Sequence, residues 1–357
     1  MPKITIITSI YQVADYIERF IDSLKSQTFK DFVVFFMNDG TKDNSFDIIR
    51  DKISGDIAYQ YIHVNAKEEI YRSDTPQNLD DAVNHGLNAT RKTALTQLDS
   101  EYFIFIDPDD WVDANYLEKL VQAADKNHSD LTKAEICKEY DGGKVVNCPR
   151  NPSIRNDISR DWPISRKCCG SQWITILYRT DFVHQNQITF KERRDGFEHD
   201  ADDIFLLECL LHQPTISFVD DTWYHYYQRA TSAVHTIDFK RYNSTVKARD
   251  IEVDLLNCAL DNHTLSPKHY GIIIRRILWE LAKHYRIYNK YDNFDRAYYF
   301  SECTKILEKV KWGNEISHSL IGFIDALLEH RYRKAHFLMS NGGCVVLDKI
   351  RLLPYGI

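Results

Sequence analysis

The chain has 357 residues, of which 43% are hydrophobic and 13% aromatic, and its formal net charge is −7. This composition excludes a disordered chain, and a pI near 6.1 excludes the overall basic field that duplex nucleic acid requires. The length exceeds what one ordinary core holds, so it predicts two units.

The eight cysteines show no C-x-x-C pair or other zinc-like spacing, so we expect reduced and mostly buried thiols. No stretch approaches the length of apolar sequence that crosses a bilayer, and the N-terminus MPKITIITSIY has a strand pattern without a charged leader. We therefore expect a cytoplasmic protein, with peripheral contact to the inner face of the membrane left open.

Strand and helix patterns alternate over the first third of the chain. Runs rich in β-branched and aromatic residues predict strands at 4–8, 32–37, 58–64 and 102–106. Apolar residues at helical spacing predict helices at 14–26, 45–53 and 80–98. This alternation predicts an α/β fold of Rossmann-like type with a mostly parallel central sheet.

The middle and the end of the chain differ from this pattern. Residues 137–171 are rich in Gly, Pro, Asn and Arg, with DGG at 141–143 and PRNPS at 149–153, which predicts loops and a hairpin in this segment. Order resumes with an apolar run at 173–178, a helix at 202–211 and a strand at 215–219. Amphipathic helices follow from 244 to about 330, with breaks at 263–267, 289–293 and 312–314. We therefore expect two domains, 1–240 and 241–357.

The segment YFIFIDPDDWV combines a buried strand with three carboxylates, those of Asp107, Asp109 and Asp110. Ligands of such sheets bind beyond the carboxyl ends of the strands, and crowded carboxylates favour a divalent cation with hard oxygen ligands. The alternative is an acidic turn that caps the next helix, with Asp110 or Asp113 as the N-cap.

The second predicted strand ends in MNDGTKDNS, where Asp39 precedes a glycine turn. A carboxylate in this position can accept a hydrogen bond from a ring N–H of a nucleotide base, although an Asx-type turn has the same signature. Three successive strand ends therefore direct polar residues to one edge of the sheet.

Taken in order, these motifs resemble the family 2 inverting glycosyltransferases, which have a GT-A type nucleotide-sugar fold. The resemblance covers residues 3–240 and includes the strand and polar end at 4–11, the acidic glycine turn at 38–45 and DPDD at 107–110. It continues with Gly86 and Arg91, the W-x-x-x-L-Y-R segment at 173–179, DDIF at 202–205 and YHYYQRATS at 224–232. The chain departs from the family pattern at Lys92, Ala94 and Ala201.

The resemblance implies a role for individual residues. Asp202 would be the general base, with Asp203 as its rival because Ala201 replaces the usual Glu. Residues implied to contact the donor nucleotide are Thr8, Tyr11, Asp39, Arg91, Asp107, Arg229 and Ser232. Residues implied to hold a divalent cation, Mn²⁺ or Mg²⁺, are Asp107, Asp109 and His235.

The implied reaction moves a sugar from a UDP-sugar donor to a hydroxyl of a glycan or lipid-linked acceptor, as in the synthesis of cell-surface polysaccharides or glycoconjugates. A cation stabilises the charge that grows on the leaving diphosphate, and a single base with a single displacement implies inversion at the anomeric carbon. The helices after residue 240 would serve homo-oligomerisation, acceptor binding or membrane-surface contact.

Two other classes of protein would have a similar sheet. A nucleotidyltransferase would need a glycine-rich phosphate loop after the first strand, and TSIYQVADYI at 8–17 contains no glycine. A non-catalytic partner or oligomerisation subunit that has kept the fold is consistent with the departures at Lys92, Ala94 and Ala201.

Overall fold

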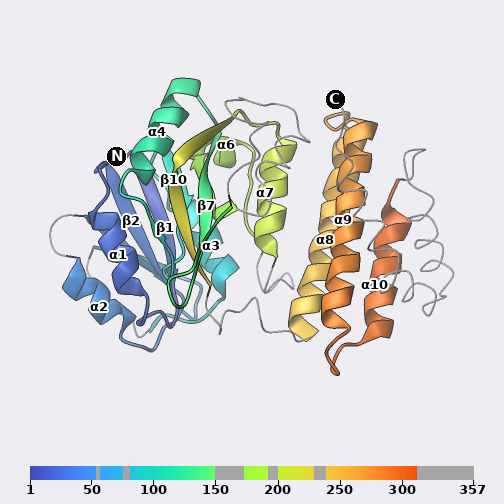
Figure 1. Ribbon diagram of the computed structural model, residues 1–357, viewed down its shortest axis with the longest axis horizontal. Coiled ribbons are helices and arrows are strands. Elements are labelled where there is room, and N and C mark those ends of the chain that lie inside the picture. Colours follow the sequence, from blue (N-terminus) through green and yellow to red (C-terminus); the bar gives the residue numbers. More distant parts are fainter. Residues whose placement is uncertain (54–56, 75–80, 149–172, 192–199, 229–238, 312–357) are drawn as a thin grey trace. The chain divides into compact units, whose positions relative to one another are not determined.

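The structure is a computed structural model that describes residues 1–53, 57–74, 81–148, 173–191, 200–228 and 239–311. The chain divides into two compact units, residues 1–232 and 233–357 (Figure 1). Among the described helices, none has both the length and the apolar character needed to cross a membrane.

One sheet organises the described part of the first unit. Its strands are β1 (Ile4–Ile10), β2 (Phe32–Asn38), β3 (Ala58–Val64), β4 (Ile70–Ser73), β5 (Tyr102–Phe105), β6 (Trp111–Val112), β7 (Leu131–Tyr140), β8 (Val145–Cys148), β9 (Ile176–Arg179) and β10 (Ile216–Gln228). Their order is β4-β3-β2-β1-β5-β9-β7-β10-β6, and β8 pairs with β7.

The sheet has a parallel part and antiparallel additions. Strands β3, β2, β1 and β5 run parallel to one another, as do β7 and β10. Strands β4, β6, β8 and β9 each pair antiparallel to their neighbours, so the sheet as a whole is mixed. The predicted α/β fold is confirmed, and the four strands predicted in the first third of the chain form one parallel part, in which β1, β2 and β5 end at one edge.

The helices of the first unit are α1 (Ile17–Lys25), α2 (Ser45–Lys52), α3 (Leu87–Thr96), α4 (Tyr116–Asn127), α6 (Thr180–Gln185) and α7 (Ala201–Leu211), with a 3₁₀ turn, η3, at Trp173–Thr175. Helix α1 buries Ile17, Phe20 and Leu24, whose spacing places them on one face. The prediction of a helix over 80–98 was wrong at its start. Helix α3 begins at Leu87, because Gly86 has φ +91° and the described residues just before it are not helical.

A hairpin was predicted within 137–171, and the structure places one at the DGG sequence. Strands β7 and β8 pair antiparallel, and Gly142 and Gly143 form the turn at φ +83° and +80°, which glycine adopts without steric cost. Strand β10 is longer than the predicted 215–219, since it continues past a register shift between Phe218 and Trp223 to Gln228.

The described part of the second unit consists of α8 (Phe239–Asp261), α9 (Pro267–Tyr288) and α10 (Arg296–Lys309). The predicted breaks at 263–267 and 289–293 are confirmed, and the break at 312–314 lies outside the described residues. Ser266 and Asp295 cap α9 and α10 by accepting hydrogen bonds from backbone N–H groups. The core of this unit is aromatic, with Tyr285 and Tyr299 fully buried.

Candidate functional site

The candidate site lies where β1, β2 and β5 end. The strand register pairs Ile7 with Phe105 and Ile10 with Asn38, so the residues that follow the three strands lie at the same edge. Tyr11 lies just beyond β1 and is 45% exposed. Thr8, which was expected to contact the nucleotide, is fully buried within β1. It is therefore part of the sheet core.

Asp39 is buried immediately after β2 and supports the loop that leads into α3. Its Oδ1 accepts hydrogen bonds from the backbone N–H groups of His85 and Gly86, both at 3.0 Å, and its Oδ2 accepts one from the Asn84 amide at 3.3 Å. Burial raises the pKa of Asp39, while the hydrogen bonds from Gly86 and His85 act in the opposite direction. A nucleotide base that donates a hydrogen bond to Asp39 would use the carboxylate lone pairs that these three bonds do not occupy.

The glycine after Asp39 allows this close approach. Gly40 has φ +73°, and a Cβ atom on it would lie 2.7 Å from the backbone nitrogen of Asn84. Within the same turn, Asp43 accepts hydrogen bonds from Ala14 N–H and from the Thr41 and Ser45 hydroxyls. The turn thus joins the ends of β1 and β2 to the start of α3.

Arg91 on α3 brings a positively charged side chain to the site. Its Nη2 lies 3.1 Å from Oδ1 of Asp107, and its side chain is only 7% exposed. The Trp173 ring stacks against the guanidinium at 4.3 Å from ring centroid to Cζ. The sequence motif predicted Arg91 as a nucleotide contact, and the structure adds its pairing with Asp107. A buried guanidinium with a half-buried carboxylate beside it can orient that carboxylate.

Asp110 does not join the other two carboxylates at the open edge. It is fully buried, its Oδ2 accepts a hydrogen bond from the Tyr224 hydroxyl at 2.7 Å, and its Oδ1 accepts one from the Tyr227 N–H at 2.8 Å. Burial and the charges of Asp109 and Asp107 raise its pKa. The expectation that DPDD delivers three carboxylates to one point was therefore wrong, because Asp110 anchors β10.

Two carboxylates remain for a divalent cation, those of Asp107 and Asp109, and both are half-buried. Within the described ranges, these aspartates do not form a group of three ligand atoms close enough to enclose an ion. Mg²⁺ and Mn²⁺ sites at phosphates often use one or two carboxylates, with substrate oxygens completing the coordination. The donor set thus fits a cation that binds together with a diphosphate.

Three predicted contacts, Arg229, Ser232 and His235, lie outside the described residues. Tyr226 is half-buried on β10 and lies within electrostatic reach of the DPDD aspartates. Burial, together with the charges of Asp110, Asp107 and Asp109, raises its pKa to about 12.

Asp202 and Asp203 lie in the first turn of α7, and both are half-buried. Burial raises the pKa of Asp202 to about 7, and the neighbouring charges of Asp203 and Asp200 add to the rise. The Arg91 guanidinium acts in the opposite direction on the same carboxyl. Asp202 is thus within electrostatic reach of the Arg91 guanidinium, which also pairs with Asp107. The pKa of Asp202 suits proton transfer near neutral pH.

The α/β sheet has carboxylates after β2 and β5, and Asp202 at the start of α7 is within electrostatic reach of Arg91, the partner of Asp107. This arrangement is that of the GT-A class of nucleotide-sugar transferase folds. Residues 5–174 match the family model for Glycosyl transferase family 2. This stretch of the chain belongs to that family.

Relatives and solved structures agree with this assignment. The poly(ribitol-phosphate) beta-N-acetylglucosaminyltransferase TarS of Staphylococcus aureus (strain Mu50 / ATCC 700699) is 23% identical over 347 residues, which is 93% of this chain and 52% of TarS. EpsH of Bacillus subtilis (strain 168), whose own assignment as a glycosyltransferase is provisional, is 24% identical over 68% of this chain and 66% of EpsH. The chain thus spans about half of TarS and just under two thirds of EpsH.

The crystal structure of S. aureus TarS 1-349 in complex with UDP-GlcNAc aligns with a TM-score of 0.67 at 17% identity. The alignment covers 95% of this chain and 90% of that chain. This likeness establishes the fold, and it extends over the helical second unit as well as the sheet.

Proposed function

We propose that the chain transfers a sugar from a UDP-sugar to a hydroxyl group of a glycan or lipid-linked acceptor, with inversion at the anomeric carbon. The observation that carries the proposal is the arrangement around Arg91. Its guanidinium pairs with Asp107 at 3.1 Å and lowers the otherwise raised pKa of Asp202. Asp107 on the donor side and Asp202, the proposed base on the acceptor side, therefore both interact with the buried guanidinium of Arg91.

The base requirement follows from the chemistry. An acceptor hydroxyl must lose its proton as it attacks, and a carboxylate with a pKa near the working pH removes that proton most effectively. Asp202 has a pKa of about 7, raised first by burial and then by the charge of Asp203. A single base that acts in one displacement gives inversion, whereas a retaining mechanism uses a second carboxylate as nucleophile.

On the donor side, Asp107 and Asp109 would hold a divalent cation, with His235 as a further proposed ligand. When bound, such a cation supplies Lewis-acid stabilisation of the charge on the leaving diphosphate. Arg91 orients Asp107 through the hydrogen bond that its Nη2 donates to Oδ1. Tyr11, Asp39, Arg229 and Ser232 are the proposed nucleotide contacts. Because TarS has been solved with UDP-GlcNAc, UDP-sugars are the donors to test first.

The acceptor class is the least specified part of the proposal. Several relatives act on polymers or lipids according to their names, such as TarS and a processive diacylglycerol beta-glycosyltransferase of Mycoplasma genitalium (strain ATCC 33530 / DSM 19775 / NCTC 10195 / G37). We propose a cell-surface polysaccharide or glycoconjugate as product. We further propose that the helical unit forms homo-oligomers or contacts the acceptor or the inner membrane surface.

The first test is binding of UDP, measured by calorimetry with and without Mn²⁺, to the wild type and to Asp109→Ala. The proposal predicts metal-dependent binding that the variant loses. Failure of UDP and of the other nucleoside diphosphates to bind under any metal condition would contradict it. That result would favour a non-catalytic partner subunit that has kept the fold.

A further inference from the structure

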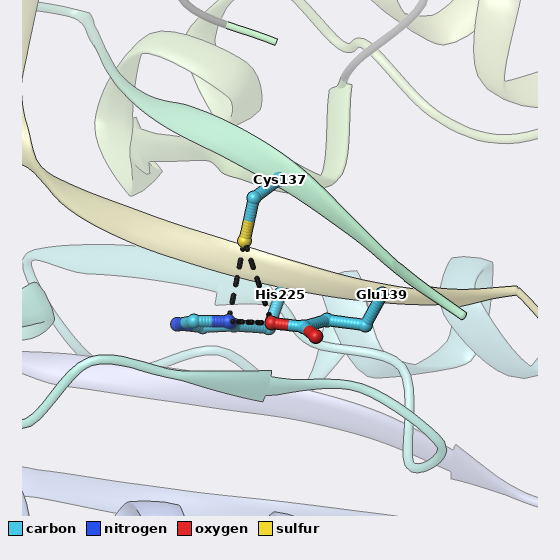
Figure 2. A group of neighbouring side chains, drawn as sticks. All are labelled: Cys137, Glu139 and His225. Atoms are coloured by element: carbon cyan, nitrogen blue, oxygen red, sulfur yellow. Dashed lines mark hydrogen bonds and ion pairs between the residues drawn. The ribbon is translucent and has the colours of Figure 1, made fainter. Parts of the chain in front are cut away.

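A second group of metal-ligand side chains lies on β7 and β10, separate from the aspartates at the end of β5. Among the described residues, Cys137, Glu139 and His225 are the group whose ligand atoms all lie within 4.8 Å of one another (Figure 2). Cys137 and Glu139 are two residues apart on β7 and so project from the same face. His225 is the register partner of Cys137 on β10. The group is therefore fixed by strand pairing.

The distances suit a small tetrahedral cation. Cys137 Sγ lies 3.2 Å from His225 Nδ1, that nitrogen lies 2.9 Å from Glu139 Oε1, and the sulfur lies 4.0 Å from the same oxygen (Figure 2). Ligands bound tetrahedrally at Zn–S of about 2.3 Å and Zn–N or Zn–O of about 2.1 Å stand about 3.3–3.6 Å apart. Side-chain shifts of about half an ångström would bring all three distances into this range.

The other ring nitrogen of His225 is held in the way that metal-bound histidines usually are. Its Nε2 lies 3.0 Å from Oδ1 of Asp113, whose Oδ2 in turn accepts a hydrogen bond from the Trp223 N–H at 2.8 Å. A carboxylate in this position accepts a hydrogen bond from Nε2–H, which directs the Nδ1 lone pair toward Cys137 and Glu139 when an ion is bound. The Trp111 ring stacks on the imidazole, with centroids 5.1 Å apart and an interplanar angle of 11°.

The charges also suit a divalent cation. In the metal-bound form a Cys137 thiolate and the Glu139 carboxylate would place two negative charges beside the ion. A divalent cation neutralises two such charges. One sulfur, one nitrogen and one oxygen ligand favour a borderline-soft ion such as Zn²⁺ over Mg²⁺ or Ca²⁺.

We propose that Cys137, Glu139 and His225 bind a zinc-class divalent cation, with Asp113 as the residue that positions His225. Three protein ligands leave a fourth position for water or another ligand. The bound ion would join β7 to β10, the strand whose Tyr224 and Tyr227 hold Asp110. This site is separate from the cation site that we propose for the transfer reaction at Asp107 and Asp109. A cation can bind here whether or not the transfer proposal is correct.

The test uses Co²⁺ as a spectroscopic probe on the full chain, reduced and stripped of metal. The proposal predicts a thiolate-to-cobalt charge-transfer band that saturates at one equivalent and disappears when Zn²⁺ is added. A site formed by Asp107, Asp109 and His235 contains no thiolate and cannot produce this band, so failure of the transfer proposal would leave the result unaffected.

Three variants complete the test. Cys137→Ser should abolish the band, and Asp113→Asn should weaken Co²⁺ binding by about 10- to 100-fold, the usual cost of losing the partner of a ligand histidine. Cys258→Ser is the matched control, since it removes an exposed thiol on α8 and should leave the band unchanged. A band that persists in Cys137→Ser, or no band at saturating Co²⁺, would overturn the proposal.

If Cys137→Ser does not fold, X-ray absorption at the zinc edge answers the same question. The sample is Asp109→Ala loaded with one equivalent of Zn²⁺, in which the competing oxygen site is removed. A coordination shell with one sulfur is expected, and a shell without sulfur would exclude the site.

Discussion

The substitution Asp202→Asn should separate the stability of the chain from its activity. Burial and the charges of Asp203 and Asp200 raise the pKa of Asp202 from its ordinary 3.8 to about 7. The folded chain therefore retains a proton on this carboxyl between about pH 4 and pH 7, where the unfolded chain has lost it. The free energy of unfolding falls as the pH rises through this window and is lowest above pH 7.

The size of the effect follows from the shift. At about 1.4 kcal/mol per pKa unit, the ionised carboxylate costs the fold at most about 4 kcal/mol at pH 8. Asn keeps the shape without the charge, so Asp202→Asn should raise the free energy of unfolding at pH 8 and change it little at pH 4. Urea unfolding followed by circular dichroism at the two pH values measures both.

The activity should change in the opposite direction. With a base of pKa about 7, about a tenth of Asp202 is ionised at pH 6 and about nine tenths at pH 8, so kcat should rise by about tenfold between them. Asp202→Asn should reduce kcat by about 10²- to 10⁴-fold. The assay is release of UDP from a UDP-sugar in the presence of acceptor.

Asp203→Asn is the matched control on the same turn of α7. Since the charge of Asp203 raises the pKa of Asp202, this variant should keep most of its activity and reach half-maximal rate at a lower pH. Turnover that survives in Asp202→Asn and disappears in Asp203→Asn would refute the assignment and make Asp203 the base.

Three further predictions concern the frame of the site. Arg91→Ala should weaken metal-dependent UDP binding by about tenfold or more in calorimetry, because Asp107 loses its charged partner at 3.1 Å. Gly40→Ala should lower stability by about 1–3 kcal/mol in urea unfolding, because φ is +73° and the added Cβ would meet backbone at 2.7 Å. Tyr224→Phe should cost about 1–3 kcal/mol in the same assay, because the buried Asp110 loses its 2.7 Å hydrogen bond. An unchanged value in any of the three would contradict the contact concerned.

The first half of the sheet could be predicted from the sequence because its signals are local. The run FVVFFM at 32–37 is apolar at every position, as expected of a strand covered on both faces, and β2 is buried throughout. Parallel strands bring their carboxyl ends to one edge, so the proximity of Asp39 and Asp107 to that edge follows from chain order alone.

The role of each side chain at that edge depended on packing between distant segments. Asp107 and Asp110 are three residues apart in one acidic turn, yet the first pairs with Arg91 and the second is enclosed by β10. Thr8 has a polar side chain but is fully buried within the sheet. Local sequence does not determine which neighbours cover a residue, and burial sets whether a polar group reaches solvent, a ligand or the core.

The sequence by itself determined the fold class, the family resemblance and the acidic strand ends, because short local segments of the chain specify each of them. Tertiary structure alone decided that β7 and β10 are neighbours, and thus that Cys137 faces His225, 88 residues further along the chain. The cysteine spacing shows no metal motif, because two of the three ligands come from β7 and the third from β10. Pairing between non-consecutive strands is a choice among many long-range contacts, and only the folded sheet reveals which one is made.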